Sequence, residues 1–349
     1  MNRIMSVLIA GTVVIISASC GGGKAVMRNP GTMVIERYPD ALYLVREGTG
    51  SSRDEAENAA RFEIARFFES RISGESIVRR WAKSVIAGGK TRERFATELT
   101  RVITVAAERD IPGIVIADAA RSGDTWRAWA VLDRAAYHQT LDERLTALDR
   151  EIIDRLALPR GSDLAYAKTL GRSLAALTER ERLRGDLSVL GFGLVPPSRS
   201  EQASELLVEL ERLLSDSFVI ALKGNSAGTG RTGGTLAGAL SAAGFRVGQT
   251  TTDDADMVLS WGIESTVSQR PLKIGDDTVE LVRIDWDLDL TAAEPGKSMQ
   301  LGSVSFHDTV TGNDETQAQR LMNARIGSDQ ARKTASWVYE LVFGETPQQ

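Results

Sequence analysis

The sequence has very few of the side chains that build cross-links and metal sites. It contains one cysteine and two histidines in 349 residues. A single cysteine cannot form a disulfide within the chain, and zinc sites made of Cys and His ligands are nearly excluded. The motif His-Glu-x-x-His is also absent, and Gly-Lys-Ser/Thr occurs only at 89–91 and 296–298, where the glycine that a P-loop needs five residues earlier is missing. We therefore predict a protein that is not an enzyme and that has no catalytic residues, no cofactor and no bound metal.

An excess of basic residues is missing as well. The chain has 42 Lys and Arg against 47 Asp and Glu, for a net charge of −5. A nucleic-acid partner would require a basic surface for its phosphates, so we expect no nucleic-acid binding. Hydrophobic residues make up 42% and charged residues 26%, which is ordinary globular composition, and the length predicts two or three compact units.

The amino terminus has the layout of a secretory signal peptide. Met1-Asn2-Arg3 is a short basic segment, residues 4–16 are almost all apolar, and residues 17–19 are small. This apolar run is too short to span a bilayer, which needs about 20 apolar residues. Residues 1–19 are therefore predicted to be removed from the mature chain.

The only cysteine, Cys20, lies at the predicted cleavage point. The segment resembles a bacterial lipoprotein signal, although Ser17 replaces the usual aliphatic residue. The resemblance implies that the Cys20 thiol receives diacylglycerol and that Cys20 starts the mature chain; the alternatives are a secreted protein with an incidental cysteine or an uncleaved anchor. No Asp follows Cys20, which by the same resemblance favours the periplasmic face of the outer membrane. Residues 20–37 are predicted to be a flexible tether.

The first globular unit is predicted over residues 38–134. Residues 41–45 and two later segments, 111–118 and 125–132, have strand character, with a turn between the last two at 122–124. Ser52 and Glu55 have the spacing of a capping box, and the apolar residues that follow predict a helix over about 54–72. A second helix is predicted around 91–109. The arrangement favours an α/β sandwich-type domain.

This unit resembles the LPP-twenty family, the twenty-kilodalton type of bacterial membrane lipoprotein. The resemblance is carried by Pro39, Tyr43, the turn at 48–50, the alanine-rich helix and the strand end at 129–134. The same module is similar to the amino-terminal domain of the flagellar assembly protein T. The resemblance implies an α/β fold that contributes no catalytic residues.

Leucine spacing predicts a helical hairpin over residues 135–195. The apolar residues between 141 and 156 recur at steps of three and four, and the pattern resumes from 164 to 177 after a break at 158–162. The charged run at 179–182 is interpreted as a solvated helix face, with partner docking as the alternative. Pro196-Pro197 predicts a domain boundary.

Residues 199–345 are predicted to form a mixed-sheet α/β domain. A helix is expected to start at a capping box formed by Ser198 and Glu201, and further helices are expected at 232–243 and 329–343, the last capped by Ser328. Strands are expected at 218–222, 257–261, 280–290 and 301–306, with a turn at 308–312. The order resembles small envelope domains such as the amino-terminal domain of TolB and the synthase activator LpoB. The chain as a whole is thus predicted to be an α+β protein.

The loop at 224–234 carries a glycine motif. Gly228, Gly230 and Gly233 fit Gly-x-Gly-x-x-Gly between a strand and a helix, and Asp253 lies 20 residues further on, as in a dinucleotide fingerprint. We reject that interpretation, because nucleotides are scarce outside the cytoplasm and because the downstream pattern predicts antiparallel hairpins. A ligand- or nucleotide-binding protein or enzyme that uses this loop remains the alternative.

A row of carboxylates is the other candidate site. Asp285, Asp287 and Asp289 alternate with apolar residues on one strand, and i, i+2 neighbours lie about 6.6 Å apart, which suits a single ion poorly. We interpret the row as a solvated sheet face and regard a metal site as the weaker alternative. His138 and His307 have no ligand spacing. The tryptophans at 126, 129, 261 and 286 are expected to pack in the core, with a carbohydrate platform as the alternative.

These observations predict a membrane-anchored lipoprotein that acts in the envelope as a non-catalytic interaction or assembly module. Its partners are expected to be the membrane, through the lipid on Cys20, and an envelope protein. Flagellar, peptidoglycan-synthetic and export machinery are equally compatible with the sequence.

Overall fold

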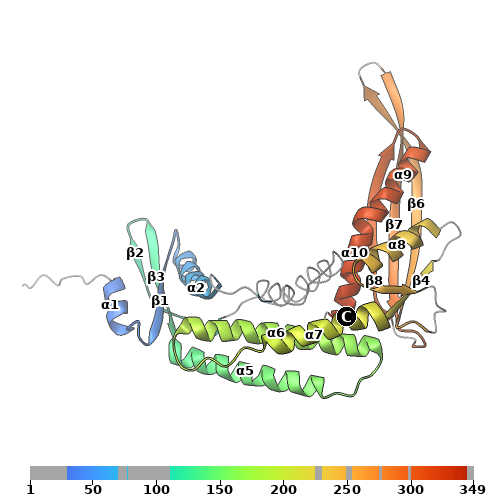
Figure 1. The fold of residues 1–349 in the computed structure, drawn as a ribbon. Helices are drawn as coiled ribbons and strands as arrows, with labels where there is room; N and C mark the ends of the chain where they lie inside the picture. The colour runs from blue at the N-terminus through green and yellow to red at the C-terminus, as the bar shows by residue number, and fades with distance from the viewer. Residues whose placement is uncertain are drawn as a thin grey trace, which may run out of the picture.

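The computed structural model confirms the α+β fold class. It describes residues 30–69, 77, 111–224, 230–248, 254–274, 277–297 and 300–343. The signal peptide, Cys20 and the helix predicted at 91–109 lie outside these ranges. A small sheet and a larger sheet lie near opposite ends of a helical hairpin (Figure 1). None of the helices in the described ranges has the length and apolar character needed to cross a membrane.

The smaller sheet has three antiparallel strands. They are β1 (Tyr43–Gly50), β2 (Val115–Ser122) and β3 (Thr125–Asp133), in the order β1-β3-β2. Side chains alternate along β3, so Trp129 and Val131 point to one face while Ala128, Ala130 and Leu132 join the main core on the other. Helix α2 (Arg53–Glu69) covers the main-core face.

The opposite face of this sheet is covered by a helix that was not predicted. Helix α1 (Pro30–Arg37) places Val34 against Trp129 and Val131. A Cβ on Gly31 would lie 3.1 Å from the Trp129 ring, so the helix approaches the indole closely. The prediction of a tether over 20–37 is therefore wrong for residues 30–37. The physical reason is tertiary, because eight residues cannot hold a helix in water without a surface to pack on.

The predicted cap of α2 is present in a slightly different form. The Ser52 hydroxyl accepts a hydrogen bond from the Glu55 amide at 3.2 Å, as in a capping box. The Glu55 carboxylate, however, accepts from the Ser51 amide at 2.8 Å rather than from Ser52. The first bond satisfies an amide of the first turn and the second ties the residue before the cap to the helix, so the helix start was predicted correctly.

The helical hairpin connects the two sheets. It consists of α5 (Arg134–Leu156) and α6 (Asp163–Leu190). Asp133 caps α5 by accepting from the amides of Ala135 and Ala136, and Ser162 caps α6 by accepting from the amide of Ala165. Gly191, in the left-handed conformation, ends α6. The leucine spacing thus predicted both helices correctly.

The larger sheet is mixed and has the order β5-β4-β6-β7-β8. Its strands are β4 (Val219–Gly224), β5 (Arg246–Gly248), β6 (Met257–Ile274), β7 (Asp277–Ala293) and β8 (Gln300–Gly312). β4 is parallel to β5 and β6, whereas β6, β7 and β8 are antiparallel. α7 (Ser200–Arg212) and a π-helical turn, η1 (Leu213–Ser217), lead into β4.

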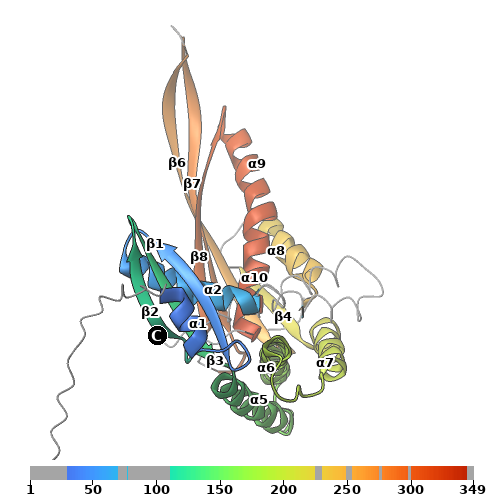
Figure 2. The ribbon, with the colours of Figure 1, turned by 90° about the vertical axis from the view of Figure 1, so that its left-hand side faces the viewer.

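Helices cover one face of the larger sheet (Figure 2). They are α8 (Gly230–Ala242), α9 (Glu315–Arg325), the π-helical turn η3 (Ile326–Gln330) and α10 (Ala331–Phe343). The alternation predicted on β7 is confirmed, because Ile284, Trp286, Leu288 and Leu290 are buried toward these helices. The aspartates between them lie on the opposite face of the sheet.

Three local predictions for this domain are wrong. Residues 308–312 continue strand β8 and pair with β7, so they are not a turn. Ser328 caps nothing, because α9, η3 and α10 follow one another without a break and the run starts at Asp314, which accepts from the Gln317 amide. α7 starts at Ser200 without a capping side chain on Arg199. The Ser198 hydroxyl accepts from the Ser200 amide at 3.2 Å rather than from Glu201, and it donates to Glu181 in the network described below.

Gly48 is the tightest packing point of the smaller sheet. A Cβ there would lie 2.1 Å from the Ala60 backbone nitrogen on α2, so Gly48→Ala would force the helix away from the sheet. We expect Gly48→Ala to cost about 1–3 kcal/mol of unfolding free energy, as overpacking does. Gly234→Ala in α8 has no heavy atom within 4 Å of the new Cβ, and this control should stabilise by about 0.5–1 kcal/mol. Chemical denaturation measures both, and equal effects would contradict this account of the packing.

Candidate functional site

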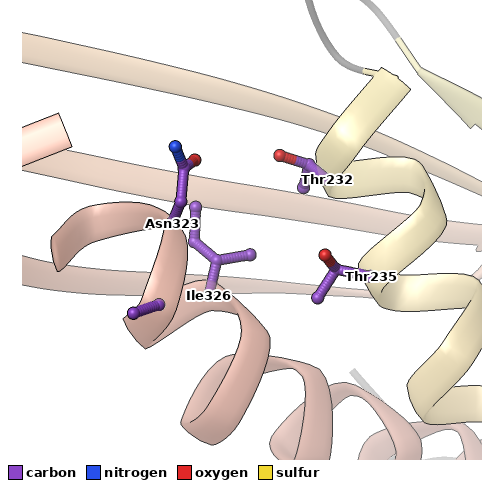
Figure 3. Close-up of a pocket in the computed structure, with 5 residues that line it drawn as sticks. Thr232, Thr235, Asn323 and Ile326 are labelled. Atoms are coloured by element: carbon purple, nitrogen blue, oxygen red, sulfur yellow. The ribbon is translucent and has the colours of Figure 1, made fainter. Parts of the chain in front are cut away.

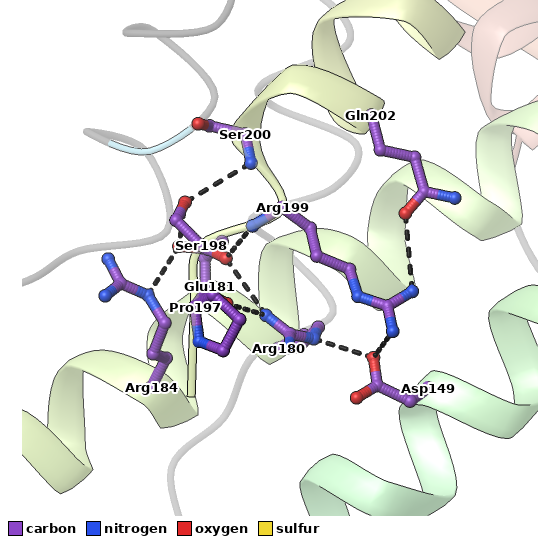
Figure 4. A network of polar contacts seen from close by, with 9 residues as sticks. All are labelled: Asp149, Arg180, Glu181, Arg184, Pro197, Ser198, Arg199, Ser200 and Gln202. Carbon is purple, nitrogen blue, oxygen red and sulfur yellow. Dashed lines mark hydrogen bonds and ion pairs between the residues drawn. The ribbon is translucent and has the colours of Figure 1, made fainter. Parts of the chain in front are cut away.

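The most extensive polar site in the described chain is a buried ion network between α5, α6 and the segment that leads into α7 (Figure 4). Arg180 is its centre, with a side chain only 2% exposed. Its Nε donates to Asp149 Oδ1 at 2.7 Å. Its Nη1 donates to Glu181 Oε1 at 3.2 Å and to the Pro197 carbonyl at 3.1 Å. Arg180 therefore joins α5, α6 and the 197–200 segment in one set of contacts.

Glu181 completes the network from the other side. Its carboxylate accepts from the Arg199 amide at 2.9 Å, from Arg184 Nε at 2.9 Å and from the Ser198 hydroxyl at 3.0 Å. The Arg199 guanidinium in turn lies 3.0 Å from Asp149. These charge-assisted bonds fix the chain where it leaves the hairpin and starts α7.

This network corrects the interpretation of residues 179–182 as a solvated face. Arg180 and Glu181 are buried, whereas Glu179 pairs at the surface with Arg144 at 3.1 Å. The charged residues of this run suggest an exposed helix face. The segment that buries two of them lies 15 or more residues further along the chain, so the run itself does not reveal their burial. The feature of the sequence that comes nearest to indicating this burial is Pro196-Pro197 with the nearby serines at 198 and 200. It indicates a conformationally restricted segment, but it does not indicate which residues that segment contacts.

The contacts around Glu181 hold the pKa of its carboxyl below the ordinary 4.5. Burial by itself raises this pKa, but the hydrogen bonds from the Arg199 amide, Arg184 and Ser198 outweigh it. Because the pKa is lowered in the folded state, Glu181 contributes stability above the pKa of the unfolded chain. That contribution is lost as the pH falls through the folded-state pKa.

We expect Glu181→Gln to destabilise the protein by about 1–3 kcal/mol at pH 7, because Arg180 loses a charged partner in a buried site. The difference from the wild type should narrow as the pH falls from about 4.5, where the unfolded chain takes up a proton, through the lower pKa of the folded carboxyl. Urea denaturation between pH 3 and 7 measures this.

Glu179→Gln is the matched control for this experiment. It removes an exposed ion pair two residues away and should cost less than about 1 kcal/mol. A constant difference between Glu181→Gln and the wild type across the pH range would contradict the role given to the Glu181 carboxylate.

The glycine loop lies in a single β-α-β unit formed by β4, α8 and β5. Gly228 and Asp253 fall outside the described residues, while Gly230 and Gly233 belong to α8. A Cβ on Gly233 would lie 3.4 Å from the Trp261 ring, which is an ordinary van der Waals contact, so α8 packs on β6 here without needing a glycine. Downstream of β5 the chain continues in the antiparallel strands β6, β7 and β8, as predicted.

A cavity of about 250 Å³ lies beside the first turns of α8 (Figure 3). Its described lining is Thr232, Thr235, Asn323, Ala324 and Ile326. The Thr232 hydroxyl points across the gap toward the Asn323 amide (Figure 3). The two threonines and Asn323 are neutral hydrogen-bonding residues, and Ala324 and Ile326 are apolar. Among the described lining residues there is therefore no acid or base that could assist catalysis.

The sequence between β4 and α8 also contains a second motif, which was not predicted. Gly224-Asn225-Ser226-Ala227-Gly228 fits Gly-x-Ser-x-Gly between a strand and a helix, the pattern of a nucleophile elbow, and Ser226 lies outside the described residues. The structure does contain an Asp–His pair, because His307 Nδ1 lies 2.9 Å from Asp287 Oδ1. That pair is on β7 and β8, and β8 is three strands from β4, about 14 Å at 4.7–4.9 Å per strand. A nucleophile and its general base must lie within hydrogen-bonding distance, about 3 Å. The Asp287–His307 pair is therefore too far from β4 to act as the base for a serine in the loop after it.

The carboxylate row is paired across the sheet and does not converge. Asp285 accepts from Arg283 and from the Thr309 hydroxyl, and the Arg283 hydrogen bond is the main cause of the lowered pKa of Asp285. Asp289 accepts from the Ser305 hydroxyl at 2.5 Å. Within the described ranges, no three acidic, histidine or cysteine side chains lie close enough together to hold a metal ion.

The remaining candidates are packing residues. Trp129, Trp261 and Trp286 are buried and Trp126 packs against the main core, as predicted. The His138 ring packs edge-on against Phe192.

No protein-family model matches the sequence, and no curated protein matches it. Solved structures resemble it weakly. A minor lipoprotein of Acinetobacter baumannii is 17% identical over 36% of this chain and 90% of its own, with a TM-score of 0.27. A secreted protein of Helicobacter pylori is 9% identical over 84% and 97%, with a TM-score of 0.37, and rare lipoprotein B of Shewanella oneidensis is 11% identical over 35% and 91%, with a TM-score of 0.23.

Proposed function

We propose that this protein is a lipid-anchored envelope protein that binds another envelope protein and performs no catalysis. The observation that carries the proposal is the position of Cys20, the only cysteine, directly after an apolar run and three small residues. Two or more acyl chains on that cysteine would attach the chain stably to a membrane. The absence of Asp after Cys20 supports the periplasmic face of the outer membrane.

A projecting ribbon supports the binding role. β6 and β7 pair as far as Ile274 and Asp277, but β4 pairs with β6 only up to Trp261 and β8 pairs with β7 only from Val282. The outer part of the β6–β7 hairpin is therefore a two-stranded ribbon, visible as the long arm in Figure 1. Such ribbons are marginally stable alone in water.

The ribbon also exposes an apolar pair. Leu272 and Val279 lie opposite each other in the β6–β7 register, and both side chains are exposed. An apolar pair on a projecting ribbon whose outer edges are unpaired among the described strands is suited to contact with a protein partner. We therefore place the partner contact on this ribbon.

A photo-crosslinking amino acid at position 272 tests this in cells that express the lipidated protein. We expect a discrete crosslinked species from position 272 and none from Leu321, an exposed leucine on α9. Equal labelling from both positions, or none from 272, would contradict a ribbon contact.

Cys20→Ser should abolish the anchor, because serine has no thiol to accept diacylglycerol. We expect the wild-type chain in the membrane fraction with an intact mass that shows lipid on residue 20. The Cys20→Ser chain should lack that mass and should no longer be held in the membrane fraction. A wild-type mature chain that starts elsewhere or carries no lipid would overturn the anchor.

The alternative function is small-ligand binding beside α8. It is favoured by one observation, the cavity beside the first turns of α8, into which the hydroxyl of the largely buried Thr232 points (Figure 3). The cavity has no basic side chain among its described lining residues to hold a polyphosphate.

We expect no shift in melting temperature with ATP, GTP, NAD or FAD at millimolar concentration. A true nucleotide site at a hundredfold excess over Kd would stabilise the fold by about 2.7 kcal/mol, which a thermal melt detects easily. A saturable shift that Gly230→Val abolishes would favour the ligand-binding alternative over the interaction protein.

A further inference from the structure

A small group of apolar side chains is exposed where the smaller sheet meets the hairpin. Leu194 is 90% exposed, and Leu42, Phe192 and Val195 are between 37% and 52% exposed. We call these four residues the apolar corner. Arg134 connects its two parts, because its amide donates to the Leu42 carbonyl at 3.0 Å and its guanidinium donates to the Leu190 carbonyl at 2.6 Å.

The loop that carries Leu194 is held in place on both sides. Gly193 has a φ of +72° and lies so close to the His138 ring that a Cβ would be 2.2 Å from Nε2. The neighbouring Phe192 ring packs on the same imidazole. On the other side the Pro197 carbonyl is bound by the buried Arg180. The fold therefore fixes this loop with the Leu194 side chain exposed to solvent.

The apolar corner lies at the end of the molecule to which the anchor is attached. Helix α1 starts at Pro30, ten residues after Cys20, and ten residues span at most about 35 Å. α1 and the start of β1 lie at the same end of the hairpin as the end of α6 (Figure 1). α1 also exposes Met33 and Ile35.

The opposite end of the hairpin is much farther from the anchor. α5 has 23 residues and is therefore about 35 Å long. A lipid on Cys20 consequently holds the corner within reach of the bilayer more readily than it does the larger sheet.

We propose that the apolar corner inserts into the lipid interface and orients the anchored protein on its membrane. Leucine, valine and phenylalanine side chains partition into the boundary between headgroups and acyl chains, as the apolar faces of peripheral proteins do. With the corner docked, the larger sheet and its β6–β7 ribbon lie at the far end of the hairpin from the membrane contact (Figure 1). This inference rests on the proposed lipid anchor, which supplies the proximity.

A fluorescent probe on residue 194 tests the inference in the lipidated full-length mature protein. The native Cys20 thiol is consumed by the acyl group, so Leu194→Cys introduces the only free thiol for the environment-sensitive dye NBD. The protein is reconstituted in phosphatidylethanolamine–phosphatidylglycerol vesicles. We expect blue-shifted NBD emission and severalfold stronger quenching by lipids that carry a nitroxide near the headgroup than by a water-soluble quencher.

Leu158→Cys is the matched control. Leu158 is also an exposed leucine in a loop before a proline, at the other end of the hairpin. Its dye should stay water-accessible. Equal water access at 194 and 158 would overturn the inference, and so would immersion of both positions. A shielded dye at 194 that no lipid quencher reaches would show a protein contact and would also overturn it.

The same two positions can be tested without the acyl group. The Cys20→Ser chain is held on vesicles by an amino-terminal histidine tag and a nickel-chelating lipid. Selective lipid quenching at 194 in this form supports the docking surface even if the intact mass shows that residue 20 carries no lipid. An intact mass without lipid on residue 20 would therefore contradict only the proposed attachment. Absence of lipid quenching at position 194 in both the wild-type-anchored and the tag-held protein would contradict the docking of the apolar corner.

Discussion

The close packing of α6 is the constraint on which the rest of the structure depends. This helix packs against α5 on one side, against α7 and η1 on another and against α10 from the larger domain. Its Gly171 lies where any Cβ would be 2.4 Å from the Phe343 ring, so the last helix of the chain rests directly on it. Side chains all around α6 are consequently buried, including polar ones.

Burial on all sides explains why α6 carries a charged network inside the protein. A charge without partners would be very costly there, and Arg180 and Glu181 are stable only because Asp149, Arg199 and the Pro197 carbonyl complete their hydrogen bonds. Removing one partner leaves the other charge buried. The network therefore fixes the path of the chain between the end of α6 and the start of α7.

The fixed path of this segment matters for the proposed function because the segment connects the exposed apolar loop to the domain that carries the β6–β7 ribbon. On one side of the fixed Pro197 carbonyl lies the loop with the exposed Leu194, and on the other α7 leads into the sheet that bears the β6–β7 ribbon. If the protein is an anchored interaction module, this connection relates the membrane-proximal end to the partner-binding end. A flexible linker at 196–200 would not transmit that orientation.

Some helices and strands could be predicted from the periodicity of their own apolar residues, because that periodicity also shows which face is buried. The leucines of α5 and α6, the small residues of α2 and the alternation of β7 each fixed an element and its buried face, because spacing in sequence equals spacing on a helix or strand. The position of Cys20 predicted an anchor for a similar reason, since a signal is contained in one short segment.

Only the tertiary structure decided the features that depend on distant residues. α1 is a helix because Trp129 and Val131 offer it a surface, and Arg180 and Glu181 are buried because the 197–200 segment returns across them. The length of the β6–β7 ribbon depends on where β4 and β8 stop pairing. No local pattern encodes such contacts, because the free energy that settles them is gained only when segments far apart in sequence meet.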